Sequence, residues 1–299
     1  MFLDPNFPMS ALMQRQRVLS VAHAVDRIRF RPRSSPCDLD CWIFQPLHRD
    51  VAAAPVIAVH GIRREAREQV ELLAEQVRLQ GRVVIAPVFD AERWPRYQQA
   101  VVRGRADKAL LRLWSELHGE GIIQAERFIL SGFSGGAQFA HRFALLQPQL
   151  IERLIVSSAG WYTFPDEAAY PYGLAPPPGR RAVDALQGNL PAFLQIPITV
   201  TIGDRDNRCD PNTRSGIAID AQQGRTRMDR AHEWCRALLA VANRFNIDAR
   251  ITVVTLPRCG HSFRRCVRRG GLDSLILPRP GQEPARMPDP GTRTLEAAA

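Results

Sequence analysis

Two serines lie three residues apart in a glycine-rich stretch near the middle of the chain. Residues 129–139 are Ile-Leu-Ser-Gly-Phe-Ser-Gly-Gly-Ala-Gln-Phe, so that Ser134 has a glycine two positions before it and two after it. This G-x-S-x-G pattern is typical of a serine on a sharp turn between a strand and a helix, where larger neighbours would collide. A serine held at the start of a helix can attack a carbonyl carbon. Ser131 has Ile129 and Phe133 at the same spacing, and we expect it to be a structural residue of the strand.

A serine nucleophile needs a general base, and three histidines follow Ser134 in the sequence. His141 lies within the helix expected after the turn, from which it reaches its own serine poorly. His232 lies within a long amphipathic helix, where a surface or packing role is expected. His261 follows an expected strand and a short turn, which is where a base must lie when nucleophile, acid and base come in that order. The sequence therefore predicts His261 as the base.

The acid that orients the base is expected at the end of the strand before the histidine. The strand at 198–202 continues into Gly203-Asp204-Arg205-Asp206-Asn207, which contains two aspartates. We favour Asp206, because it lies further into the turn, where its carboxylate can meet an imidazole. Asp204 is the alternative, although it is close enough to the strand to accept hydrogen bonds from turn amides instead. Asp210 is a third candidate.

Negative charge that develops on an attacked carbonyl oxygen needs two backbone donors. One donor is expected from the residue after the nucleophile, Gly135. The other is expected from Ile62, in the loop that follows the strand at 55–60. His60-Gly61 resembles the start of an HGGG-type loop, although only one glycine is present. His60 either braces this loop or is a core histidine with its hydrogen bonds satisfied.

Alternating strands and helices must bring these residues together. The strand at 55–60 is an uninterrupted apolar run, which fits burial on both faces of a sheet. Gly81 is expected to close the helix at 65–80 in a left-handed conformation. The alternation predicts an α/β fold with about eight mostly parallel strands and helices on both faces. The expected strands are 27–31, 37–44, 55–60, 83–86, 128–130, 154–156, 198–202 and 251–256, and the expected helices are 65–80, 99–118, 135–147, 226–245 and a short one after His261.

The 299 residues are 45% hydrophobic, which suffices for a large core. We expect one α/β domain at 26–277, an N-terminal arm at 1–25 and a disordered tail at 278–299, which is rich in proline, glycine and charge. Residues 161–196 interrupt the alternation with many aromatic residues and prolines. This segment is predicted to be either a cap over a site or an irregular packed loop.

Composition argues against several other classes of protein. The net charge is +10, but the basic residues are scattered, Lys108 is the only lysine, and no nucleic-acid-binding module is present. No apolar stretch reaches the roughly 18 residues of a membrane span, and no signal peptide is apparent, so we expect a cytoplasmic protein. The six cysteines form no zinc-binding pattern and are expected to be free thiols. We hypothesise that Cys209 and Cys259 can pair under oxidising conditions.

The ordered set of motifs resembles the α/β-hydrolase superfamily over residues 26–277. It comprises His60-Gly61, Gly132-Phe133-Ser134-Gly135-Gly136, Asp206 and Gly260-His261-Ser262. The stretches 159–166 and 256–262 are similar to bacterial hydrolases near the polyhydroxyalkanoate depolymerase and feruloyl esterase-like groups. Depolymerases of that kind are often secreted and carry substrate-binding modules, and the sequence has neither feature.

The resemblance implies a serine hydrolase that cleaves a small-molecule carboxylic ester or thioester through an acyl-enzyme, without a metal or an organic cofactor. Amide or peptide hydrolysis by the same residues is an alternative, because the fold does not fix the leaving group. A non-catalytic binding protein with this fold is another. Either substrate contact or simple packing is expected for Phe133, Trp161, Tyr162 and Trp94. The oligomeric state is left open.

Overall fold

The computed structural model describes residues 26–102, 104–176, 183, 185–207, 213–279 and 287. The expected N-terminal arm at 1–25 and nearly all of the expected tail lie outside the described residues. The described part of the chain has no helix that is long and apolar enough to cross a lipid bilayer.

One sheet of eight strands, in the order β1-β2-β4-β3-β5-β6-β7-β8, forms the centre of the domain. β2 runs antiparallel to its neighbours β1 and β4, and every pairing from β4 to β8 is parallel. The predicted α/β architecture with a mostly parallel sheet is therefore confirmed. The strands are β1 (Ile28–Arg31), β2 (Asp40–Phe44), β3 (Val56–Val59), β4 (Val84–Val88), β5 (Phe128–Phe133), β6 (Ile151–Ser157), β7 (Ile198–Gly203) and β8 (Ile251–Leu256).

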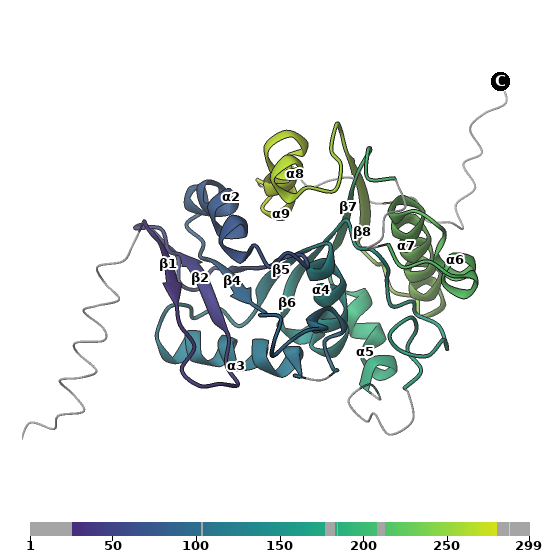
Figure 1. Cartoon of the computed structure of the whole chain (residues 1–299), viewed down its shortest axis with the longest axis horizontal. Coiled ribbons are helices and arrows are strands. Elements are labelled where there is room, and N and C mark those ends of the chain that lie inside the picture. Colours follow the sequence, from purple (N-terminus) through teal and green to yellow (C-terminus); the bar gives the residue numbers. More distant parts are fainter. Residues whose placement is uncertain are drawn as a thin grey trace, which may run out of the picture.

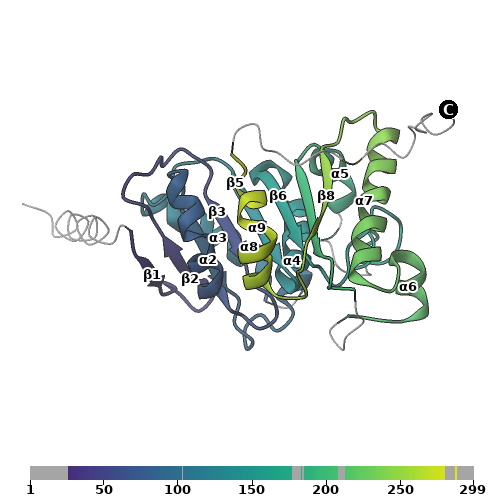
Figure 2. The same cartoon turned by 90° about the horizontal axis from the view of Figure 1, so that it is seen from above.

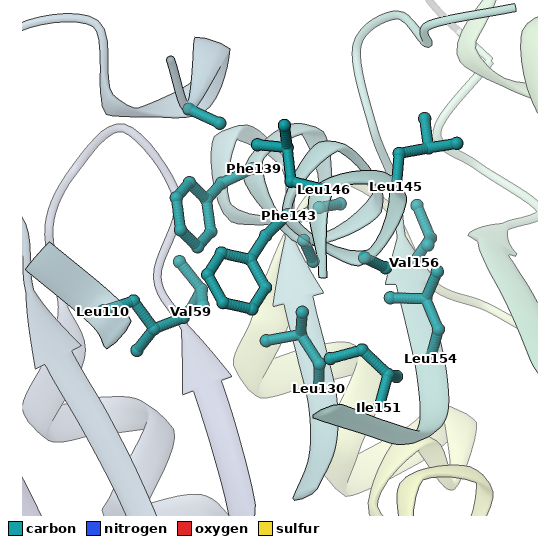
Figure 3. Packing of buried hydrophobic residues seen from close by; sticks show 14 of the residues in the cluster. Val59, Leu110, Leu130, Phe139, Phe143, Leu145, Leu146, Ile151, Leu154 and Val156 are labelled. Atoms are coloured by element: carbon teal, nitrogen blue, oxygen red, sulfur yellow. The ribbon is translucent and has the colours of Figure 1, made fainter. Parts of the chain in front are cut away.

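The central strands are apolar throughout because both of their faces are covered. Along β3, Val56 and Ala58 contribute to the core on one face, whereas Ile57 and Val59 contribute to the core on the other. Successive side chains of a strand point to opposite faces, so an uninterrupted apolar run serves both cores. Figure 3 shows part of the larger core, in which aromatic side chains of the helix after β5 lie over side chains of β3, β5 and β6.

The helices form two layers, one on each face of the sheet. α2, α8 and α9 lie on one face, and α3, α4 and α5 lie on the other, with α6 and α7 beside the β7–β8 end (Figures 1 and 2). This arrangement positions α2 and α8 on the same side of β3 and β5. The α-helices are α2 (Ala66–Leu79), α3 (Ala106–Gly119), α4 (Gly135–Leu146), α5 (Ala185–Leu194), α6 (Ile217–Gln223), α7 (Arg227–Arg244), α8 (Phe263–Gly270) and α9 (Leu272–Ile276).

Most predicted helices begin and end within a few residues of the observed bounds, and Gly81 has the expected positive φ of 64°. The helix predicted at 99–118 is the exception, because α3 begins only at Ala106. Ala100 and Arg105 have φ values of 51° and 47°, which are incompatible with a right-handed helix. The chain instead forms a short 3₁₀ turn at Tyr97–Gln99 before the helix starts.

Candidate active site

Ser134 lies on the turn between β5 and α4, with the strained backbone that this turn requires. Its φ of 56° and ψ of −114° are unusual for a residue with a side chain. A Cβ on Gly132 would lie 2.2 Å from the carbonyl oxygen of Gly136, and a Cβ on Gly136 would lie 2.0 Å from the carbonyl oxygen of Val59. The two glycines are therefore required for close backbone packing. Ser131 is a buried residue of β5, as predicted.

Three side chains from the carboxyl ends of β5, β7 and β8 form a continuous row of hydrogen bonds. Nε2 of His261 lies 2.9 Å from Oγ of Ser134, and Nδ1 of His261 lies 2.7 Å from Oδ2 of Asp206. The parallel order of the strands places these ends at one edge of the sheet. The structure thus brings together three residues that are predicted from sequence to act as nucleophile, base and acid.

Asp206 is held from its other side by Arg227, a residue that the sequence analysis did not identify. Oδ1 of Asp206 accepts a hydrogen bond from the Arg227 guanidinium at 3.1 Å, and the two side chains are 4% and 2% exposed. Arg227 is the first residue of α7, and no local motif connects it with the turn after β7. A buried carboxylate needs compensation of this kind, because loss of its hydration disfavours the charge.

Asp204 has a different role from Asp206, and its geometry matches the alternative that we gave for it. Its carboxylate accepts hydrogen bonds from the backbone amides of Arg258 at 2.8 Å and Cys259 at 3.0 Å. The bond from the Arg258 amide is the main reason that the pKa of Asp204 is lowered. Asp204 therefore joins the turn after β7 to the loop that carries His261, and its carboxylate bonds to backbone amides rather than to that imidazole. The remaining candidate, Asp210, lies outside the described residues.

The two predicted amide donors are neighbours. A Cβ on Gly135 would lie 3.4 Å from the Ile62 amide nitrogen, and a Cβ on Gly61 would lie 3.4 Å from Cβ of Ser134. Neither the Ile62 nor the Gly135 amide donates to an acceptor within the described part of the chain. Two amides beside the serine are therefore available to a ligand oxygen.

His60 braces the loop that carries Ile62. Its Nδ1 donates to the carbonyl oxygen of Gly61 at 2.8 Å, while its Nε2 accepts from the Phe89 amide at 3.1 Å. The hydroxyl of Tyr97 donates to the carbonyl oxygen of His60 at 2.6 Å. Burial lowers the pKa of His60 to about 4, so the ring is neutral at pH 7. A fully buried histidine with both ring nitrogens satisfied thus fixes the backbone at 60–61.

A pocket of about 240 Å³ opens beside the serine. Its walls come from the loop at 61–65, the start of α2, the β5–α4 turn and the loop that leads into α8. Phe133 is the one predicted substrate contact among its lining residues, and its ring lies 5.1 Å from that of His261. The lining residues are Gly61, Ile62, Arg63, Glu65, Glu68, Gln69, Phe133, Ser134, His261, Ser262, Phe263 and Arg264.

Comparison with solved structures identifies the architecture. A poly(3-hydroxybutyrate) depolymerase from Bordetella parapertussis superposes with a TM-score of 0.74 at 23% identity, covering 91% of this chain and 96% of the other. Poly(aspartic acid) hydrolase-1 from Sphingomonas sp. KT-1 superposes with a TM-score of 0.71 at 21% identity, covering 83% and 98%. The chain has the α/β-hydrolase fold. A fluorophosphonate-binding serine hydrolase from Staphylococcus aureus is more distant, with a TM-score of 0.53 at 12% identity, covering 84% and 97%. No protein-family model and no curated protein matches the sequence.

Within this α/β-hydrolase fold, Tyr162 and Trp94 follow the packing alternative rather than the substrate-contact alternative. Tyr162 is completely buried, and its ring stacks on Trp234 at a centroid distance of 4.7 Å. Trp94 is 2% exposed, packs against Phe89, and donates from Nε1 to the carbonyl oxygen of Gly104. Neither side chain lines the pocket beside the serine. Both side chains belong to the larger hydrophobic core.

Residues 161–176, the aromatic part of the segment predicted as either a cap or a packed loop, form a packed loop, and α5 lies in the rest of that segment. Trp161 is 5% exposed, lies under the Arg142 guanidinium at 4.1 Å from its ring centroid, and contacts Tyr172. Arg142 is fully buried on α4 and also donates to Thr163. Burial lowers the pKa of Arg142 to about 10. The segment is therefore anchored to the interior, and residues 177–182 and 184 of the predicted cap lie outside the described residues.

The cysteine and metal predictions can be compared with the fold only in part. Cys259 is a buried free thiol whose Sγ donates to the carbonyl oxygens of Pro257 and Arg265. Its hypothesised partner, Cys209, lies outside the described residues. Within the described ranges, no three His, Cys, Asp or Glu side chains gather closely enough to hold a metal ion.

Proposed function

We propose that this protein is a serine hydrolase that cleaves a carboxylic ester or thioester through a covalent acyl-enzyme. The observation that carries the proposal is the unbroken row of hydrogen bonds from Ser134 through His261 to Asp206. A nucleophile, a base and a buried acid in this order are the parts that acyl transfer requires.

In the first half of the reaction, Oγ of Ser134 attacks the carbonyl carbon while its proton moves to Nε2 of His261. Asp206 accepts from Nδ1–H and stabilises the resulting imidazolium. The amides of Ile62 and Gly135 donate to the oxyanion, which lies beside the serine where these two groups meet. His261 then gives its proton to the departing alcohol or thiol as the bond to the acyl carbon breaks, which leaves the acyl group on Ser134.

In the second half, a water molecule takes the place of the leaving group. His261 accepts a proton from this water as its oxygen attacks the acyl carbon. Collapse of the intermediate returns the proton to Oγ of Ser134 and releases the carboxylic acid. Arg227 acts as a positioning residue throughout, because it fixes Oδ1 of Asp206 and leaves Oδ2 for the imidazole. Phe133 and Ile62 contact the bound substrate from the pocket wall.

Hydrolysis of an amide is a second candidate. It is favoured by the structural neighbour named as a hydrolase of poly(aspartic acid), whose residues are joined by amide bonds. The neighbour named as a depolymerase of poly(3-hydroxybutyrate), a polyester, favours the ester. The same serine and histidine serve both reactions, and the leaving group decides between them. We place the ester first because an ester or thioester is the more reactive acyl donor, whereas the nitrogen of an amide must be protonated before it can leave.

A fluorophosphonate probe tests whether Ser134 is the nucleophile. We expect the wild-type protein and Ser131→Ala to be labelled and Ser134→Ala to remain unlabelled. Labelling that persists in Ser134→Ala and disappears in Ser131→Ala would overturn the assignment, and an unlabelled wild-type protein would favour a binding role. Steady-state rates on p-nitrophenyl esters of increasing acyl length and on peptide anilides then separate the two reactions. Rapid anilide cleavage without ester turnover would refute the esterase proposal.

A further inference from the structure

One side chain on the inner face of α2 does not match its surroundings. The buried positions of this helix are Ala66, Gln69, Val70, Leu73 and Val77, so a single carboxamide stands among four apolar side chains. A helix that packs on a sheet normally has apolar residues at all such positions. A leucine or methionine would fill the same volume without a polar atom.

The carboxamide of Gln69 also lacks a partner for its oxygen. Gln69 is 3% exposed, and its Oε1 is buried without a hydrogen-bond partner in the part of the chain that the structure describes. A buried acceptor of this kind costs free energy, because its bond to water is lost and nothing replaces it. Such a group is therefore expected to serve a purpose other than stability.

The location of Gln69 suggests that purpose. It lines the same pocket as Ser134 and His261. The neighbouring residue, Glu68, forms an ion pair across the pocket with Arg264 of α8, at 2.8 Å from Nε and 2.7 Å from the terminal nitrogen. α2 and α8 lie on the same face of the sheet (Figure 2). The pocket therefore has charged lining residues besides Gln69, and a volume of about 240 Å³ accommodates only a short group.

We infer that Gln69 is a specificity-determining residue, and that its carboxamide oxygen accepts a hydrogen bond from an O–H or N–H group on the substrate. The inference rests on the proposed function and specifies its substrate class. The group bound in this pocket is a short chain that carries a hydrogen-bond donor close to the scissile carbonyl. A hydroxyacyl chain and an acylamino chain share this chemistry. A plain alkyl chain leaves the acceptor unsatisfied and is bound less well.

Three activated esters of similar size test the inference, namely the p-nitrophenyl esters of butyric acid, 3-hydroxybutyric acid and N-acetylglycine. For the wild-type protein we expect kcat/KM on at least one donor-bearing ester to exceed that on the butyrate ester by about tenfold, which corresponds to the net contribution of about one hydrogen bond. In Gln69→Met, which keeps the volume and removes the acceptor, we expect this ratio to fall to within about twofold of one. The ratio for each donor ester shows whether a hydroxyl or an amide N–H is preferred.

Gln76→Met is the matched control. It makes the same change on the same helix, but Gln76 donates to the carbonyl oxygen of Leu277 and is absent from the pocket lining. We expect this control to retain the wild-type preference. A thermal unfolding curve for each variant shows that the domain is folded, and Gln69→Met should unfold no earlier than the wild type because it removes an orphaned polar atom.

The outcomes separate the inference from the function on which it rests. If Ser134 is labelled and the wild-type protein hydrolyses all three esters at equal rates, the inference is overturned. This outcome depends on the wild-type protein alone, so it holds even if Gln69→Met does not fold. A preference that persists in Gln69→Met would overturn it too. If no ester is hydrolysed and the serine is not labelled, the proposed function itself has failed.

Discussion

Replacement of Asp206 by asparagine tests the proposed catalytic residues at the position where the chemical requirement is strictest. The two carboxylate oxygens have different partners, Nδ1 of His261 at 2.7 Å and the Arg227 guanidinium at 3.1 Å. Asparagine offers one acceptor where two are needed. If its oxygen faces His261, its NH₂ group meets the N–H groups of Arg227. If its NH₂ group faces His261, the ring proton must move to Nε2, which can then no longer accept the proton of Ser134.

Both orientations are therefore unproductive, and burial keeps water from relieving either one. We expect kcat/KM on p-nitrophenyl acetate to fall by about 10³–10⁴-fold, the size of effect typical when the acid of a serine triad becomes an amide. At about 1.36 kcal/mol per tenfold, this loss corresponds to ~4–5.5 kcal/mol of transition-state stabilisation. Initial rates measured at several substrate concentrations, with circular dichroism to verify folding, give the comparison.

Asp204→Asn is the control, because it makes the same chemical change two residues earlier in the same turn. The carboxylate of Asp204 bonds to backbone amides of the His261 loop rather than to the imidazole. We expect its activity to fall by no more than about tenfold. Equal losses in the two variants would refute the reasoning, as would an Asp206→Asn protein that retains more than about a tenth of the wild-type activity.

Three further predictions concern the parts that surround these residues. Gly136→Ala places a Cβ within 2.0 Å of the carbonyl oxygen of Val59 and should abolish fluorophosphonate labelling. Gly188→Ala in α5 is the control, because a Cβ there meets nothing within 4 Å. In urea unfolding, this control should have a free energy of unfolding about 0.5–1 kcal/mol higher than the wild type. His60 has its pKa lowered by burial from 6.5 to about 4, so between these pH values the unfolded chain binds a proton that the native protein does not, and stability falls as the pH is lowered through this window. Across the whole window the free energy of unfolding falls by about 3 kcal/mol. His60→Gln should flatten the slope of unfolding free energy against pH, and an unchanged slope would contradict the burial argument. Arg142→Met removes the cation above the Trp161 ring, and thermolysin should cleave residues 161–176 at least about fivefold faster than in the wild type, while equal cleavage rates would show that this anchor is dispensable.

The alternation of strands and helices was predictable because a doubly covered sheet demands continuous apolar runs, and β3 supplies one. The start of α3 was not. Ala100 and Arg105 adopt positive φ values although neither is a glycine, and the one residue type there that signals a break is Gly104, whose φ is 93°. The positive φ values of Ala100 and Arg105 go against the preference of residues with a side chain, and the helix was therefore predicted to begin too early.

The serine, aspartate and histidine of the site were accessible from sequence because each follows a strand of a parallel sheet, and such strand ends share one edge. Arg227 was not accessible, because its contact with Asp206 joins the start of a helix to a turn 21 residues earlier. The aromatic residues could be predicted only as either substrate contacts or packing. Residue type alone does not separate a ring in a pocket from a ring in the core, and Tyr162 belongs to the core. Gln69 left a detectable signal, a lone amide in an apolar helical stripe.

The turn after β7 and the loop after β8 are fastened directly to each other. Besides the bonds from Asp204, the Arg205 amide donates to the carbonyl oxygen of Cys259 at 2.9 Å, and Gly203 leaves only 2.2 Å between that oxygen and any Cβ built in its place. Asp206 and His261 therefore lie on two segments that are bonded directly to each other, whereas Ser134 lies on the β5–α4 turn. We expect slow opening of this edge to lengthen the Ser134–His261 separation and to leave the imidazole–carboxylate pair intact. When this edge of the sheet loosens, Ser134 then loses its hydrogen bond to His261 first, while Asp206 still orients the His261 ring.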